Sequence, residues 1–98
     1  MAHSTVTQAF FLESRLRDAG RGDSKAYFDL GMAFSSGAGG AEVDLIQAHK
    51  WFNLAALGGS GEAQRWRAEI SDEMSAREIA EAQRQARAWL NETGRRAA

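Results

Sequence analysis

Glycine clusters and the complete absence of proline decide what this chain of 98 residues can fold into. Most of the ten glycines stand in three clusters, at 20–22, 37–40 and 58–61. Glycine adopts the left-handed conformation that ends helices without steric cost, so each cluster predicts a break between helices. Alanine, leucine and charged residues dominate the segments in between, which favours helix over strand. The sequence therefore predicts an all-α fold, an antiparallel helix-hairpin stack of about five helices.

Capping residues indicate where these helices begin. Asp23 is a good N-cap, and Asp44 with Gln47 forms the pattern of a capping box, in which each side chain bonds the other residue's backbone N–H. Ser75 and Glu78 repeat that pattern. With the spacing of the apolar residues, these signals predict helices over 5–19, 24–36, 44–56, 61–70 and 75–90, followed by a polar tail from Asn91.

The first predicted helix leaves one alternative open. Phe10 and Phe11 lie beside the apolar stripe, so they either fill the core or form a patch that faces a partner; core filling is the favoured interpretation. Glu13 and Arg17 are spaced for an i,i+4 ion pair. The stripe predicted to be buried consists of Ala9, Leu12, Leu16 and Ala19, and its counterpart in the third helix consists of Ala48, Trp51, Phe52 and Ala55.

Composition excludes several classes of function. The formal net charge is −1 and the pI is about 6.1, so the chain lacks the basic surface that nucleic acid or an anionic membrane requires. No apolar run approaches the roughly 20 residues that a transmembrane helix needs. The apolar start at 6–12 lacks a basic region before it, which favours a helix of the domain over a signal peptide. Cysteine is absent, which favours a reducing, cytoplasmic location.

No pattern predicts a catalytic, cofactor or metal site, and we expect that the chain is not an enzyme. His49 is interpreted as a partly exposed helix residue, because a metal site needs three or four converging ligands. The run 37–40 follows a helix rather than a strand, so it is interpreted as a turn and not a phosphate loop. Acidic residues of the second half alternate with arginines, with Arg77 and Glu81 four positions apart, which predicts a solvated, salt-bridged helix face.

One stretch resembles a Sel1-like repeat, a helix–loop–helix unit of the tetratricopeptide-related families, in the short bacterial type. About ten positions agree at fixed spacing, although the loop at 38–43 is a residue longer than the family pattern and lacks its usual proline. The matching residues are Ala26, Leu30, Gly31, Phe34, Gly37, Asp44, Ala48, Trp51, Phe52, Ala55, Ala56 and Gly59.

The resemblance implies how the chain is organised. Residues 1–98 form a single domain, with a full repeat at 26–59. The N-terminal helix at 5–19 and the partial repeat with its C-terminal capping helix at 61–91 are expected to cover the two ends of that unit.

The resemblance also implies a function, that of a non-catalytic adaptor or scaffold for proteins. Its partner is expected to be a protein or peptide, held on the surface of the first helix of the repeat, where Lys25, Phe28, Asp29 and Met32 stand. One unit makes only a shallow surface, which favours a modest-affinity contact or a homodimer. The alternatives are a structural subunit or homo-oligomer of a larger assembly, and a small-ligand-binding protein or enzyme.

These alternatives predict different surfaces. A closed cavity lined by His49, Asn53 and a carboxylate would favour the enzyme. A flat or concave apolar face bounded by charges would favour the adaptor.

Overall fold

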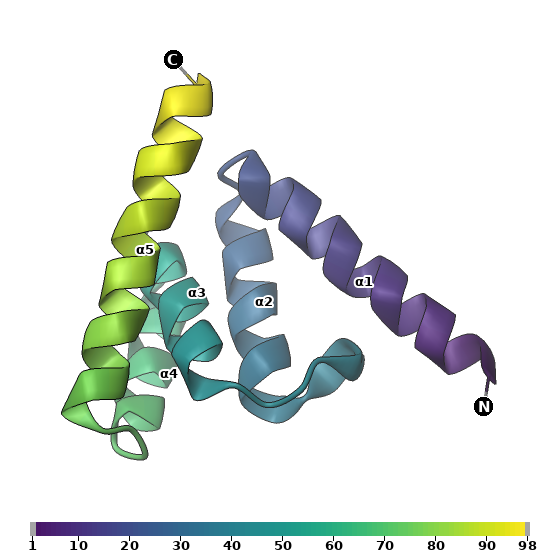
Figure 1. Ribbon diagram of the computed structural model, residues 1–98, viewed down its shortest axis with the longest axis horizontal. Helices are drawn as coiled ribbons and strands as arrows, with labels where there is room; N and C mark the ends of the chain where they lie inside the picture. The colour runs from purple at the N-terminus through teal and green to yellow at the C-terminus, as the bar shows by residue number, and fades with distance from the viewer. Residues whose placement is uncertain (1, 98) are drawn as a thin grey trace.

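The chain is all-α, and its computed structural model describes residues 2–97 (Figure 1). Five α-helices and one short 3₁₀ helix make up the described part, which contains no strand. The helices are α1 (Ala2–Gly20), α2 (Ser24–Ser36), α3 (Leu45–Leu57), α4 (Gly61–Ser71) and α5 (Ala76–Ala97), with the 3₁₀ helix η1 (Ala38–Gly40) after α2.

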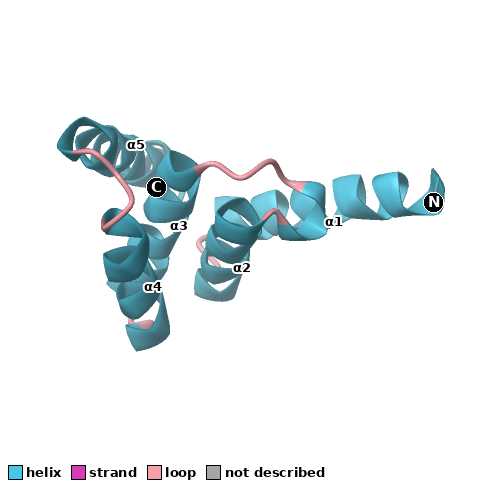
Figure 2. Ribbon diagram, turned by 90° about the horizontal axis from the view of Figure 1, so that it is seen from below, coloured by secondary structure: helices cyan, strands magenta, loops and turns pink. Residues whose placement is uncertain are grey.

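Helices α2 to α5 form two layers, and α3 is the helix that contacts all of the others. Figure 2 shows α2 and α4 along one side of the stack and α3 and α5 along the other. Helix α3 packs against α2, α4 and α5, so it is the central element of the fold. Helix α1 packs against α2 and η1, and its N-terminal end reaches out beyond the rest of the molecule (Figures 1 and 2).

The predicted caps position the helices, with one difference. Asp23 accepts a hydrogen bond from the backbone N–H of Lys25 at 2.9 Å, and Ser75 and Glu78 make both bonds of their capping box, at 2.8 and 3.1 Å. The Asp44 side chain accepts from the backbone N–H of Gln47 at 3.1 Å. The Gln47 side chain, however, does not return to Asp44, because its amide donates to Gln85 of α5 at 3.0 Å. Half of the predicted box is thus replaced by a bond between α3 and α5.

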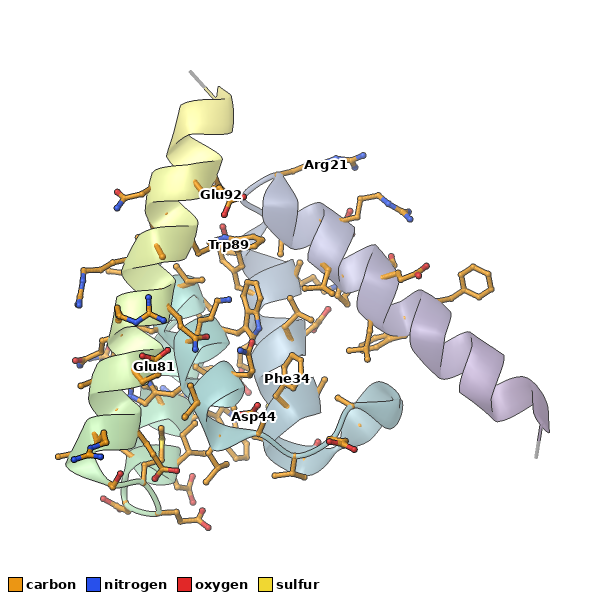
Figure 3. The ribbon with its side chains drawn as sticks, in the orientation of Figure 1. Arg21, Phe34, Asp44, Glu81, Trp89 and Glu92 are labelled. Atoms are coloured by element: carbon orange, nitrogen blue, oxygen red, sulfur yellow. The ribbon has the colours of Figure 1, made fainter. Side chains whose placement is uncertain are left out.

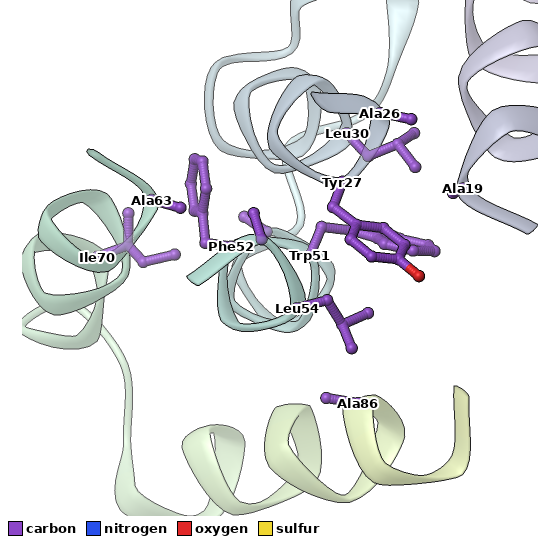
Figure 4. Packing of buried hydrophobic residues seen from close by; sticks show 12 residues of the cluster. Ala19, Ala26, Tyr27, Leu30, Trp51, Phe52, Leu54, Ala63, Ile70 and Ala86 are labelled. Carbon is purple, nitrogen blue, oxygen red and sulfur yellow. The ribbon is translucent and has the colours of Figure 1, made fainter. Parts of the chain in front are cut away.

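The core lies between α3 and its three neighbours. The predicted buried face of α3 is confirmed: Ala48, Trp51, Phe52 and Ala55 are all buried (Figure 4). The rings of Tyr27 and Trp51 stack at 5.9 Å between centroids, and Trp89 meets Trp51 edge-on at 4.9 Å. Trp89 also donates its indole N–H to the Tyr27 hydroxyl at 3.2 Å, so one aromatic cluster joins α2, α3 and α5 (Figure 3).

A close approach between α2 and α3 is centred on Gly31. A Cβ atom at this position would lie 2.5 Å from the Phe52 ring, closer than side chains pack. Phe52 therefore occupies space that only glycine leaves free. From there its ring contacts Phe28 at 5.7 Å and Trp66 at 6.3 Å between centroids, so a row of three aromatic rings runs from α2 through α3 to α4.

Helix α1 differs from its prediction. The side chains of Phe10 and Phe11 are 65% and 39% exposed, and Leu16 is 42% exposed, so the expectation that they fill the core is wrong. Ala19 is fully buried and Leu12 is partly buried, as predicted, whereas the side chain of Ala9 lies outside the described residues. The physical reason is the direction of α1, which diverges from α2 toward the N-terminus (Figure 1).

Helix α5 also differs from its prediction. It continues past Asn91 to Ala97, because the sequence there contains no proline to end it. The predicted Arg77–Glu81 pair does not form; Glu81 instead accepts two hydrogen bonds from Arg84, at 2.8 and 2.6 Å. These bonds and one from Gln85 lower the pKa of Glu81 to about 2.

Candidate functional site: a groove between α2 and α4

The four residues predicted to bind a partner follow one another along α2 but have different surroundings. Lys25 is exposed, whereas Phe28, Asp29 and Met32 are half-buried. Asp29 faces α1, where its carboxylate accepts a hydrogen bond from Arg15 at 3.2 Å. The structure thus places Asp29 in an internal ion pair rather than on a free surface.

Met32 is the member of the set that opens onto a hollow. A cavity of about 290 Å³ lies between the C-terminal half of α2 and α4, beside the segment that leads into α3. Its floor is apolar, and we call it the α2–α4 groove. The groove is lined by Met32, Ser35, Ser36, Val43, Leu45, Trp66, Glu69, Ile70 and Glu73.

The row of aromatic rings supports the floor of this groove. Trp66 stacks on Phe52 with an angle of 13° between the ring planes, so its indole is held against the core. Phe28 packs on the other side of Phe52, which explains why it is half-buried. Phe28 therefore contributes to the groove by fixing its floor, and Met32 by lining it.

Two carboxylates border the apolar floor. Glu69 lies in the last part of α4, and Glu73 lies in the turn that follows this helix; both side chains line the groove. Arg65, four residues before Glu69, makes no ion pair with it, and neither glutamate has an ion-pair partner among the described side chains of residues 10–94. The groove thus combines an apolar floor with uncompensated negative charge at its edge.

Sequence reasoning did not assign Glu69 and Glu73 to this site. The pattern showed them among alternating charges, which indicates a solvated face. The missing information is which residues of α2 lie opposite α4, and no local pattern carries it. The one available signal was the spacing of Trp66 and Glu69 along the helix predicted at 61–70, with Glu73 shortly after its end.

His49 is buried, with 3% of its surface exposed, so the expectation of a partly exposed residue is wrong. Burial lowers the pKa of His49 first, and the positive charge of Arg67 lowers it further. The Nδ1 atom of His49 is buried without a hydrogen-bond partner, which is compatible with a neutral ring. Asn53 is also engaged, because it accepts a hydrogen bond from Arg67 at 2.6 Å. These side chains pack between α3 and α4 and line none of the described cavities.

We expect His49 to make stability depend on pH. Its folded-state pKa lies below the ordinary value of 6.5, so the unfolded chain binds a proton before the folded chain does. The free energy of unfolding is therefore constant with respect to this group above pH 6.5 and falls as the pH drops from there to the lowered pKa. Urea unfolding of the wild type and of His49→Gln between neutral and mildly acidic pH measures the effect. An equal decline in both proteins would contradict it.

Lys50 lies against aromatic rings, which sequence reasoning did not predict. Its ammonium nitrogen is 4.4 Å from the centroid of Trp51 and 5.3 Å from that of Trp89. Burial lowers the pKa of Lys50, and the negative charge of Glu92 partly opposes this change. The cation is stabilised by the faces of the rings, so we assign Lys50 to the contact between α3 and α5.

A second hollow lies at the other end of the stack. It measures about 570 Å³ and is lined by the α1–α2 turn, the end of α3 and the last part of α5. Leu57 and Leu90, which are 67% and 44% exposed, form its apolar wall. No carboxylate lines this hollow, which distinguishes it from the α2–α4 groove.

Among the described side chains, those of residues 10–94, no three His, Asp or Glu stand close enough to hold a metal ion together. No helix within residues 2–97 is long and apolar enough to cross a membrane.

Comparisons with protein-family models, with curated proteins and with solved structures found no match for this chain.

Proposed function

We propose that the protein is a non-catalytic interaction module that binds a segment of another protein in the α2–α4 groove. The observation that carries this proposal is the concave apolar floor bordered by the unpaired carboxylates of Glu69 and Glu73. A surface of this kind favours the adaptor over the enzyme. The resemblance to a Sel1-like repeat supports the same surface, because the first helices of the full and partial units would be α2 and α4. The absence of cysteine supports a reducing, cytoplasmic location.

The groove indicates the chemistry of the bound segment. Its volume of about 290 Å³ lies at the lower limit for small-molecule pockets, about 300 Å³, and suits one large apolar side chain of a peptide. The carboxylates at the edge favour a lysine or arginine next to that side chain. We therefore infer a partner segment in which a leucine, methionine or phenylalanine adjoins a basic residue.

Selection from a displayed library of random peptides tests this function. We expect the wild type to enrich peptides in which a basic residue adjoins a large apolar residue. The double variant Glu69→Gln, Glu73→Gln should lose this enrichment, because it removes the charge and keeps the shape of the groove. Val43→Asp should lose it too, because Val43 lines the groove with 61% of its surface exposed.

The matched control is the double variant Gln83→Lys, Asn91→Lys. Both of its positions are exposed on α5, and it has the same net charge as the glutamine variant. We expect it to enrich the same peptides as the wild type. Two outcomes would contradict the groove as the binding site. One is a loss of enrichment in the control, and the other is unchanged enrichment in the variant with both glutamine changes.

A further inference from the structure

The side of α1 that faces away from the molecule has an unusual composition. The inner side is defined by Ala19, which is fully buried, and by Arg15, which binds Asp29 of α2. At about 100° per residue, Phe10, Glu13 and Arg17 fall on the opposite side. We call these three residues the outer face of α1. Phe10 is 65% exposed there, although a large aromatic side chain gains free energy by leaving water.

Among the side chains that the structure describes, neither charge of the outer face has an ion-pair partner. Glu13 and Arg17 have the spacing of an intrahelical ion pair, but the structure shows none between them. Within the described part of the chain, the ion pairs of α1 and the turn that follows it are formed by Arg15 with Asp18 and Asp29, and by Arg21 with Asp18. One negative and one positive side chain thus remain next to an exposed aromatic ring.

We propose that the outer face of α1 binds the outer face of a second copy of this chain. We consider two copies of α1 that meet antiparallel, with the two-fold axis crossing the outer face at the level of residue 15. Glu13 of each copy then lies opposite Arg17 of the other. The two copies then form two ion pairs that involve all four charges, so the surface is complementary to itself. A parallel arrangement would instead place like charges together, which is unfavourable.

The same register gives Phe10 a place to pack. With Glu13 opposite Arg17, each Phe10 lies opposite Gly20 of the other copy. Gly20 has no side chain, and the space around its Cβ position is open, with no heavy atom within 4 Å. A large ring on one copy therefore meets a gap on the other, at both ends of the contact.

The rest of the molecule favours a closed dimer over a filament. Filament growth would require a different surface, such as the exposed side of α5, to receive Phe10. The exposed side of α5 is mostly polar, with Arg77, Gln83, Arg84 and Arg87, and its large exposed apolar side chain, Leu90, faces the hollow beside Leu57. A symmetric contact between two α1 helices buries the outer face of both copies, so the assembly is closed as a dimer.

Charge reversal in two separate chains tests the pairing. Arg17→Glu makes both charges of the outer face negative, and Glu13→Arg makes both positive. We expect the wild type to dimerise in sedimentation equilibrium at low salt, with a dissociation constant between about 10 μM and 1 mM. This weak affinity is expected because a contact between two single helices is smaller than a standard interface. Each variant alone should associate at least about tenfold more weakly than the wild type. An equimolar mixture of the two variants should form heterodimers at least as tightly as the wild type forms homodimers.

Three results would overturn the proposal: a monomeric wild type throughout this range, reversed variants that each dimerise like the wild type, or a mixture that fails to associate. The apolar contact has its own test. Phe10→Ser should weaken the dimer, whereas Leu57→Ser should not, although Leu57 is equally exposed at 67% and lies on α3. Circular dichroism confirms that each variant remains folded. Because the α2–α4 groove is not involved, the dimer and the peptide-binding function can fail independently.

Discussion

Replacing Phe52 with alanine is expected to lower the free energy of unfolding by about 3–5 kcal/mol, the usual cost of removing a buried phenylalanine ring. The side chain is fully buried and contacts aromatic rings on both neighbouring helices, Phe28 on α2 and Trp66 on α4. Its loss leaves a cavity bordered by rigid rings, which relax little. A domain of this size is stable by about 5–15 kcal/mol, so the change removes a large share of the total. Urea unfolding followed by circular dichroism measures it.

The control is the same substitution at Phe10, measured in dilute protein. Because the Phe10 ring is exposed, Phe10→Ala should change the free energy of unfolding by no more than about 0.5 kcal/mol. If Phe52→Ala proves unfolded, the smaller change Phe52→Leu keeps the prediction testable. The free energy of unfolding of Phe52→Leu should lie between that of the wild type and that of the alanine variant. Equal effects at positions 52 and 10 would show that the row of aromatic rings does not hold the three helices together.

Gly31→Ala is the second large effect, and its sign depends on Phe52. In an exposed helix this substitution stabilises by about 1 kcal/mol. Here the new Cβ would lie 2.5 Å from the Phe52 ring, so we expect a loss of about 1–3 kcal/mol from overpacking. In a Phe52→Leu background the flat ring is gone, and the loss should shrink or become a gain. The double-mutant cycle measures this coupling.

A cycle without coupling would contradict the close packing of α2 on α3. Gly94→Ala provides the comparison, because it lies in α5 with nothing within 4 Å of its Cβ position. We expect that variant to be as stable as the wild type or slightly more stable.

The local part of the fold was predictable from the sequence. Asp23 and Gly37 determine the two ends of α2 through short-range geometry, an N-cap bond and a left-handed glycine with φ of 78°. The buried face of α3 follows from the period of its apolar residues, because α3 is central and any orientation of its neighbours covers it. Both predictions depend on residues fewer than eight positions apart.

Predictions that depended on the direction of a helix were less successful. Whether Phe10 is buried depends on the angle between α1 and α2, and no residue of α1 encodes that angle. The same limit applies to His49, whose burial comes from α4, and to the side chain of Gln47, which finds Gln85 in α5 rather than Asp44. In the candidate site, Met32 was predicted from its helix alone, and Glu69 and Glu73 required knowing that α4 lies beside α2.

The hydrogen bond from Trp89 to Tyr27 joins residues 62 positions apart, which has a consequence during protein synthesis. A ribosome completes Tyr27 and Trp51 well before it reaches the residue that covers them. Until α5 emerges, the unfinished chain exposes aromatic surface of the kind that chaperones hold and that drives aggregation. Docking of α5 therefore completes the aromatic cluster, and a chain truncated before Trp89 leaves the rings of Tyr27 and Trp51 without this cover.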